Sequence, residues 1–213
     1  MQTFSNTAGA AIIDKLILVI QENKQYLSDI DGLIGDGDHG INMNKGFSMC
    51  REELDKNPGD MAYSLKVLSK ILMMKIGGSM GPLYGKFFKA IALSLEGKEE
   101  IGIAEMGNAL KAAVDAIASI SPAKVGDKTL IDTLIPAVEA FEKAHKEGKI
   151  FTESLEAMKV AAVIGRDSTK DMVAKLGRAS RLGERSRGVL DAGATSCCLI
   201  LEVIGSGAQK LID

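Results

Sequence analysis

Apolar residues recur at helical spacing along almost the whole chain of 213 residues, and this periodicity limits the fold more than any other feature. Residues three, four and seven positions apart share one face of an α-helix, so each such run predicts an amphipathic helix. The runs cover residues 13–27, 43–54, 65–76 and roughly 82–96, 103–119, 129–146, 152–174 and 193–212. The sequence therefore predicts about eight helices.

Signals for β-strands are weak by comparison. Alternating apolar and polar residues between hairpin turns are missing, and aromatic residues make up only 4% of the chain. Neither an internal repeat nor a Pro/Ser-rich linker divides the sequence. We therefore expect an all-α fold with a single domain that covers residues 1–213.

The composition argues against several classes of partner. The formal net charge is −2, so no strongly basic surface indicates nucleic acid or an anionic membrane. The apolar stretch 11–20 is too short to span a bilayer and contains Asp14 and Lys15. An odd number of cysteines without framework spacing, namely Cys50, Cys197 and Cys198, indicates reduced thiols packed in the core. We expect a cytoplasmic protein with no nucleic-acid or membrane partner.

The stretch DGLIGDGDHG, residues 31–40, places Asp31, Asp36 and Asp38 in one glycine-rich turn. Carboxylates at this spacing repel one another unless a cation lies among them. Hard oxygen ligands suit Mg²⁺ or, by charge alone, Ca²⁺, but no Glu closes an EF-hand loop here. The alternative is a turn in which Asp38 caps the helix that begins near Gly40. Because capping accounts for one aspartate and not three, the sequence favours a metal site.

His39 directly follows these aspartates and opens a helix. It could transfer protons, bind the metal or be an ordinary residue of the turn. The N–H groups at a helix N-terminus point toward anions, which makes contact with a phosphate the favoured role. The contact would involve His39, Gly40, Ile41 and Asn42.

Two further segments have the composition of binding loops. GGSMGPLYG, residues 77–85, is not a Walker A loop, because no Gly-Lys-Ser/Thr closes it. A plain turn between helices, with Pro82 at the first helical position, is an equal alternative. Residues 176–192 form a long loop that carries four arginines, and guanidinium groups match the geometry of phosphates. This loop is a candidate lid over a polyphosphate, with a solvated surface of salt bridges as the alternative.

Four blocks in this order and spacing, GDGDHG, GGSMGPLYG, GDKT and GRASRLGERS…DAGATS, resemble the nucleotide-binding L subunits of bacterial dihydroxyacetone kinases over nearly the whole chain. The resemblance implies a barrel of eight antiparallel amphipathic helices with ADP or ATP at one end. It implies two Mg²⁺ ions, held by Asp31, Asp36 and Asp38, that bind the phosphates. It assigns a catalytic role to Arg178 in the lid and nucleotide contacts to His39, Gly40, Ile41, Asn42, Ser79, Met80, Ser121, Leu130, Arg178, Asp191, Ala192 and Gly193.

In this family the L domain is either fused to a dihydroxyacetone-binding domain or a separate subunit. We expect the separate form, since the chain begins almost directly at the first helix and ends at the last. The resemblance then implies that ADP stays bound as a coenzyme. A phosphoryl-carrier M subunit of the phosphotransferase system, supplied by phosphoenolpyruvate, phosphorylates it in place, and the γ-phosphate passes to dihydroxyacetone on a K subunit.

Two alternative functions remain open at this point. The chain could be an ADP-loaded regulatory module that binds a transcription factor and performs no chemistry. It could also be an ATP-dependent kinase subunit for a related triose or sugar alcohol. Phosphoryl transfer assayed with and without the K and M partners separates these possibilities.

Overall fold

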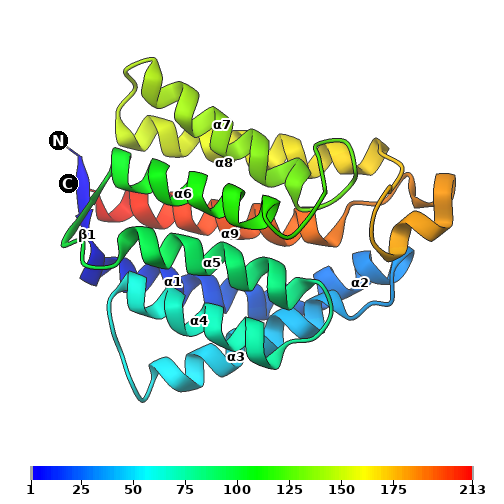
Figure 1. The fold of residues 1–213 in the computed structure, drawn as a ribbon, viewed down its shortest axis with the longest axis horizontal. Helices are drawn as coiled ribbons and strands as arrows, with labels where there is room; N and C mark the ends of the chain where they lie inside the picture. The colour runs from blue at the N-terminus through cyan, green and yellow to red at the C-terminus, as the bar shows by residue number, and fades with distance from the viewer. Residues whose placement is uncertain (1, 213) are drawn as a thin grey trace.

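A computed structural model describes residues 2–212, in which helices surround one elongated apolar core (Figure 1). From α3 onward, consecutive helices run in alternating directions. The described α-helices are α1 (Asn6–Glu22), α2 (Lys24–Ile34), α3 (His39–Leu54), α4 (Met61–Lys75), α5 (Met80–Leu95), α6 (Ile103–Ala118), α7 (Ile131–Lys146), α8 (Phe151–Ser168) and α9 (Ala192–Leu211). The predicted all-α fold is confirmed.

The core forms because each helix turns one apolar face inward. In α1, for example, Ile13, Ile17 and Ile20 are fully buried, as their spacing predicts. Burying a side chain of this size stabilises the folded state by about 1.5–3 kcal/mol. Across the core, the rings of Phe47 and Phe88 meet edge to face with their centroids 5.9 Å apart. Helix α9 packs against both α1 and α8, so the last helix closes the barrel.

Two helix boundaries differ from the sequence-based prediction. The predicted helix 13–27 is two helices, because the backbone leaves helical geometry at Asn23, with φ −95° and ψ 7°. There the Nδ2 of Asn23 donates to the carbonyl of Val19 at 2.8 Å. The predicted helix 152–174 ends at Ser168 and continues as the short 3₁₀-helix η1 (Thr169–Asp171). Both breaks reorient the chain beside the site described below.

A small two-stranded ribbon was not predicted. Strands β1 (Thr3–Ser5) and β2 (Glu100–Gly102) pair antiparallel, with Thr3 opposite Gly102. Three residues are too few for alternation to be recognised in the sequence. The ribbon joins the N-terminal segment to the α5–α6 connection at the end of the barrel where both termini lie (Figure 1).

Two expectations from composition can be compared with the structure. Cys50, Cys197 and Cys198 are buried and form no disulfide, as predicted. Among residues 2–212, no helix combines the length and the apolar character that crossing a membrane requires.

Candidate metal and nucleotide site

A cavity of about 380 Å³ opens at the end of the barrel opposite the termini. Segments far apart in the sequence form its wall: the α2–α3 turn, the α4–α5 turn, the α6–α7 loop, the start of α9, and residues 176–179 of the loop that precedes α9. That loop, which we call the lid (residues 176–191), contains the 3₁₀ segment η2 (Arg178–Ser186) and is therefore more structured than the sequence suggested. The cavity thus brings all four glycine-rich blocks together.

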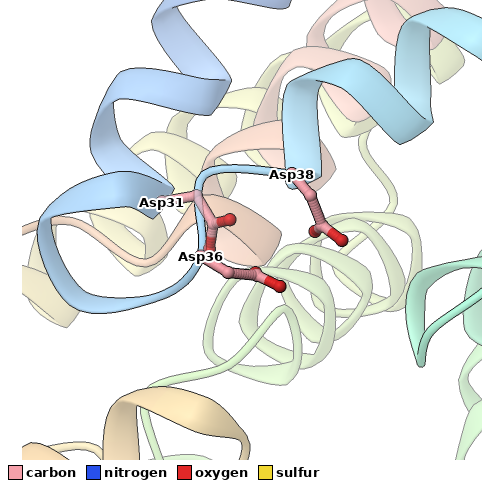
Figure 2. A group of neighbouring side chains, drawn as sticks. All are labelled: Asp31, Asp36 and Asp38. Carbon is pink, nitrogen blue, oxygen red and sulfur yellow. The ribbon is translucent and has the colours of Figure 1, made fainter.

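Three aspartates lie at one side of this cavity. Asp31 belongs to the last turn of α2, while Asp36 and Asp38 belong to the turn that leads into α3. One carboxylate oxygen of each lies within 4.8 Å of the others, and Figure 2 shows the three side chains around one small space. Gly37 between them has φ +74°, a conformation that glycine adopts without steric cost. The turn therefore gathers the charge that the sequence indicated.

The electrostatics of the cluster fit a divalent cation. Loss of hydration, together with the negative charges of Asp36 and Asp31, raises the pKa of Asp38. Among residues 2–212, the one cationic side chain in an ion pair with the cluster is Arg178 of the lid, whose Nη2 lies 2.9 Å from Oδ2 of Asp36. One guanidinium beside three carboxylates leaves an excess of negative charge among hard oxygen ligands, which suits Mg²⁺.

The capping alternative explains little of this arrangement. Asp38 occupies the N-cap position of α3, but its side chain accepts no capping hydrogen bond. Instead, the backbone N of His39 donates to Oδ2 of Asp31 at 3.3 Å. Since α3 begins without a side-chain cap from Asp38, that carboxylate remains available to the cluster.

His39 is the first residue of α3, and a hydrogen bond to a side chain of α9 orients its ring. Its Nε2 lies 2.9 Å from Oγ of Ser196 in α9, and this hydroxyl lies 2.6 Å from the hydroxyl of Tyr84 in α5. Burial lowers the pKa of His39 to about 4, although the charge of Asp31 opposes this shift. The imidazole is therefore neutral near pH 7, which makes it a hydrogen-bonding group in an oriented position.

Most residues that the sequence analysis assigned to nucleotide binding do line the cavity. Besides the three aspartates they are His39, Asn42, Ser79, Met80, Ser121, Leu130, Arg178, Asp191, Ala192 and Gly193. Burial raises the pKa of Asp191 to about 7. The hydrogen bond that its side chain accepts from the backbone N of Ala194 partly opposes this shift. That bond makes Asp191 the N-cap of α9.

Gly40 and Ile41 lie outside the cavity lining. A Cβ on Gly40 would lie 2.0 Å from the carbonyl oxygen of Lys24, so this glycine permits close packing of α3 on α2. Ile41 is 52% exposed on the outer surface of the first turn of α3. Pro82, expected at the first helical position, is the third residue of α5, which begins at Met80.

Several residues around the site were missed by the sequence analysis. Asp132 is buried and accepts hydrogen bonds from the backbone N of Gly126 and, at 2.7 Å, of Thr129, which fixes the GDKT turn. Its position three residues after Thr129 is the signal that could have revealed it. Lys128 is also buried, although a lysine in a loop is ordinarily exposed. Tyr84 and Ser196 were missed because each lies within a predicted helix among apolar core residues.

Comparison with known proteins shows the family to which this chain is similar. Residues 33–206 match the family model described as the DAK2 domain. The ADP-binding subunit DhaL of PEP-dependent dihydroxyacetone kinase 2 from Listeria innocua is 35% identical, over 94% of each chain. The corresponding ADP-binding subunit DhaL from Escherichia coli is also 35% identical, over 90% of this chain and 92% of that protein.

A solved structure supports the same fold. The crystal structure of the dihydroxyacetone kinase of C. freundii superimposes with a TM-score of 0.72 and 22% sequence identity. The match covers 95% of this chain and 34% of that longer one. The family model matches most of the chain, and relatives of similar size match it almost end to end. The chain therefore belongs to the DAK2 domain family.

Proposed function

We propose that this chain is the ADP-binding subunit of a phosphoenolpyruvate-dependent dihydroxyacetone kinase, a phosphotransferase. The observation that carries the proposal is the cluster of Asp31, Asp36 and Asp38, with Arg178 of the lid beside it, at the mouth of one cavity. Relatives that match almost end to end bear that name. The regulatory alternative needs bound nucleotide as well, but it gives no role to a lid arginine placed at the carboxylates.

Asp31, Asp36 and Asp38 would hold Mg²⁺, and we propose two ions. Bound there, Mg²⁺ would neutralise negative charge on the phosphates during transfer. The three carboxylates, together with the anionic phosphates of a bound nucleotide, would carry more negative charge than Arg178 and one divalent ion neutralise, which supports the count of two. Loss of hydration and the charges of Asp36 and Asp31 raise the pKa of Asp38, so a cation in the cluster would be favourable.

The chain's own groups bind and orient the nucleotide in this proposal. Met80, Ile117 and Leu130 belong to the apolar part of the lining, where a base would lie, and Ser121 also lines the cavity. Arg178 places a guanidinium at the carboxylate cluster, where it can contact phosphoryl oxygens. His39, held by Ser196, offers a neutral ring at the N-terminus of α3, where backbone N–H groups also favour an anion.

ADP would serve as a bound coenzyme that accepts a phosphoryl group and passes it on. We propose a phosphoryl-carrier M subunit of the phosphotransferase system as the donor and a K subunit that holds dihydroxyacetone as the acceptor. The product would be dihydroxyacetone phosphate. Because the cavity has its carboxylates and its lid at one end, both partners have to approach the same face, so their binding should be mutually exclusive.

Labelled ADP bound to the chain tests this proposal. With phosphoenolpyruvate, the carrier proteins and a large excess of unlabelled ADP, we expect the label to appear in ATP that remains on the chain. The dihydroxyacetone-loaded partner should then return the label to ADP. Rapid dilution of the label into the free pool would show an exchangeable substrate and contradict the coenzyme role. Asp36→Asn serves as the control that cannot retain the label.

A further inference from the structure

Lys128, in the GDKT turn, carries an ammonium group that is buried at the base of the lid. The side chain is only 1% exposed, and all its hydrogen-bond partners are backbone carbonyls. Its Nζ donates to the oxygens of Val189 at 2.6 Å, Ser186 at 2.7 Å, Thr169 at 2.8 Å and Met172 at 3.3 Å. A buried ammonium is costly unless it is hydrogen-bonded in this way, so the cage of carbonyls compensates the charge.

The four carbonyls belong to the two roots of the lid. Thr169 begins η1 and Met172 follows it, so both precede the lid, whereas Ser186 is the last residue of η2 and Val189 follows that segment. Other contacts also cross the base: the backbone N of Ala174 donates to Oγ of Ser186, and that of Gly188 donates to the carbonyl of Lys170. Of the residues that make these contacts, only Lys128 comes from a third segment, the α6–α7 loop, and binds to both roots of the lid.

That third segment is part of the cavity wall. Lys128 and the two residues that follow it, Thr129 and Leu130, line the cavity, and Asp132 fixes the turn by accepting hydrogen bonds from its backbone. Lys128 itself has φ +62°, which is unfavourable for a residue with a side chain and persists only where the surroundings enforce it. The backbone therefore adopts a costly conformation that carries the ammonium into the lid base.

We propose that Lys128 is a positioning residue for the lid, and this rests on the nucleotide-binding function proposed above. By holding both lid roots to the wall of the cavity, it sets the position from which Arg178 reaches Asp36. The lid tip can then open while its base stays in place. The consequence for function is a slow release of bound nucleotide.

Two substitutions separate the ammonium from the bulk of the side chain. Lys128→Met keeps most of the volume and removes the charge, whereas Lys128→Gly removes the side chain and tolerates the positive φ. Lys175→Met is the matched control, because Lys175 pairs with Asp127 of the same turn at 3.3 Å but its side chain is 63% exposed. An exposed pair of this kind contributes little.

Hydrogen exchange of the nucleotide-free protein gives the first readout. In Lys128→Met we expect amides of residues 172–189, including Ala174 and Gly188, to exchange about tenfold faster or more, with α1 and α4 unchanged. ADP release should accelerate by a similar factor. Lys175→Met should alter neither rate by more than about twofold. Equal acceleration in all helices, or an unchanged lid, would overturn the proposal.

Chemical rescue gives the second readout and does not depend on how well the Met variant folds. In Lys128→Gly, n-butylammonium should restore slow exchange of the lid amides, whereas n-butanol should not. Equal rescue by both compounds would show that the site needs only apolar filling, and the positioning role would be wrong. If the wild-type chain binds no ADP, the proposed function fails, while the exchange data still decide the role of Lys128.

Discussion

The two ends of the barrel are built from the same helices but differ in almost every chemical respect. At the end with the termini, Phe151 packs against Phe4 and Phe141, and the ribbon β1–β2 covers the core. At the other end, three carboxylates lie together, and the connections contain most of the described glycines with positive φ, namely Gly37, Gly78, Gly126, Gly177, Gly183 and Gly188. Gly97 and Gly148, in the α5–β2 and α7–α8 connections, are the exceptions. Mutually repelling charge is thus concentrated where a ligand can compensate it, while the opposite end supplies stability.

The largest effect on stability is expected at the end with the termini. Phe151→Ala removes a ring that is 1% exposed and should lower the free energy of unfolding by about 3–5 kcal/mol. The affinity of the folded protein for ADP should change by less than about twofold, because distant sites act independently. Denaturant unfolding and calorimetric titration measure the two quantities. A parallel loss of ADP affinity would break the separation of the two ends.

The opposite pattern is expected for the carboxylates. Asp36→Asn or Asp38→Asn should weaken Mg²⁺-dependent ADP binding by more than about a hundredfold. A residue that only hydrogen-bonds to a metal ligand typically costs about 10–100-fold when it is mutated, and a ligand itself should cost more. For Asp38→Asn, the metal-free protein should be as stable as the wild type or more so at pH 7. The reason is that loss of hydration and the neighbouring carboxylates raise the pKa of Asp38, so its ionised form opposes folding.

Calorimetric titration with ADP in the presence of Mg²⁺ measures the first effect of these variants, and thermal unfolding in chelator measures the second. A marked loss of stability in metal-free Asp38→Asn would mean that the carboxylate has a structural partner instead. For the wild type, chelation in the presence of ADP should lower the melting temperature, since ligands that bind only the folded state stabilise it.

The lid should show an intermediate effect. Arg178→Ala should weaken nucleotide binding and slow transfer by about ten- to a hundredfold, equivalent to about 1.5–3 kcal/mol for a charge-assisted contact. Arg181→Ala is a suitable control, because Arg181 is an exposed arginine of the same 3₁₀ segment. Arg187 is less suitable, since it contacts Glu184 and the carbonyl of Asp171. Equal small losses in Arg178→Ala and Arg181→Ala would favour a merely solvated lid surface.

The smallest effect is expected for the thiols. Burial raises the pKa of Cys50 and of Cys198 to about 12, and that of Cys197 further. All three should remain protonated at pH 8 and resist alkylation in the folded protein, then react fully in denaturant. Mass spectrometry counts the labels. Rapid labelling of Cys198 without denaturant would indicate that α9 opens locally.

The sequence predicted the helical part of the fold well because apolar periodicity is a local property. It could not predict the break at Asn23, since Leu27 continues the buried pattern beyond it. The aspartate turn was equally predictable, because three carboxylates within eight residues need no tertiary information. The role of Lys128 depends instead on four carbonyls more than 40 residues away in the chain, which no local pattern contains.

Native mass spectrometry of the purified chain with ADP and Mg²⁺ tests the central claim most directly. The account predicts one ADP and two Mg²⁺ ions on each wild-type chain. Both should be lost together on chelation and should be absent from Asp36→Asn. Retention of ADP after removal of the metal, or wild-type chains without ADP, would contradict the assignment of Asp31, Asp36 and Asp38 as the metal-bridged phosphate site.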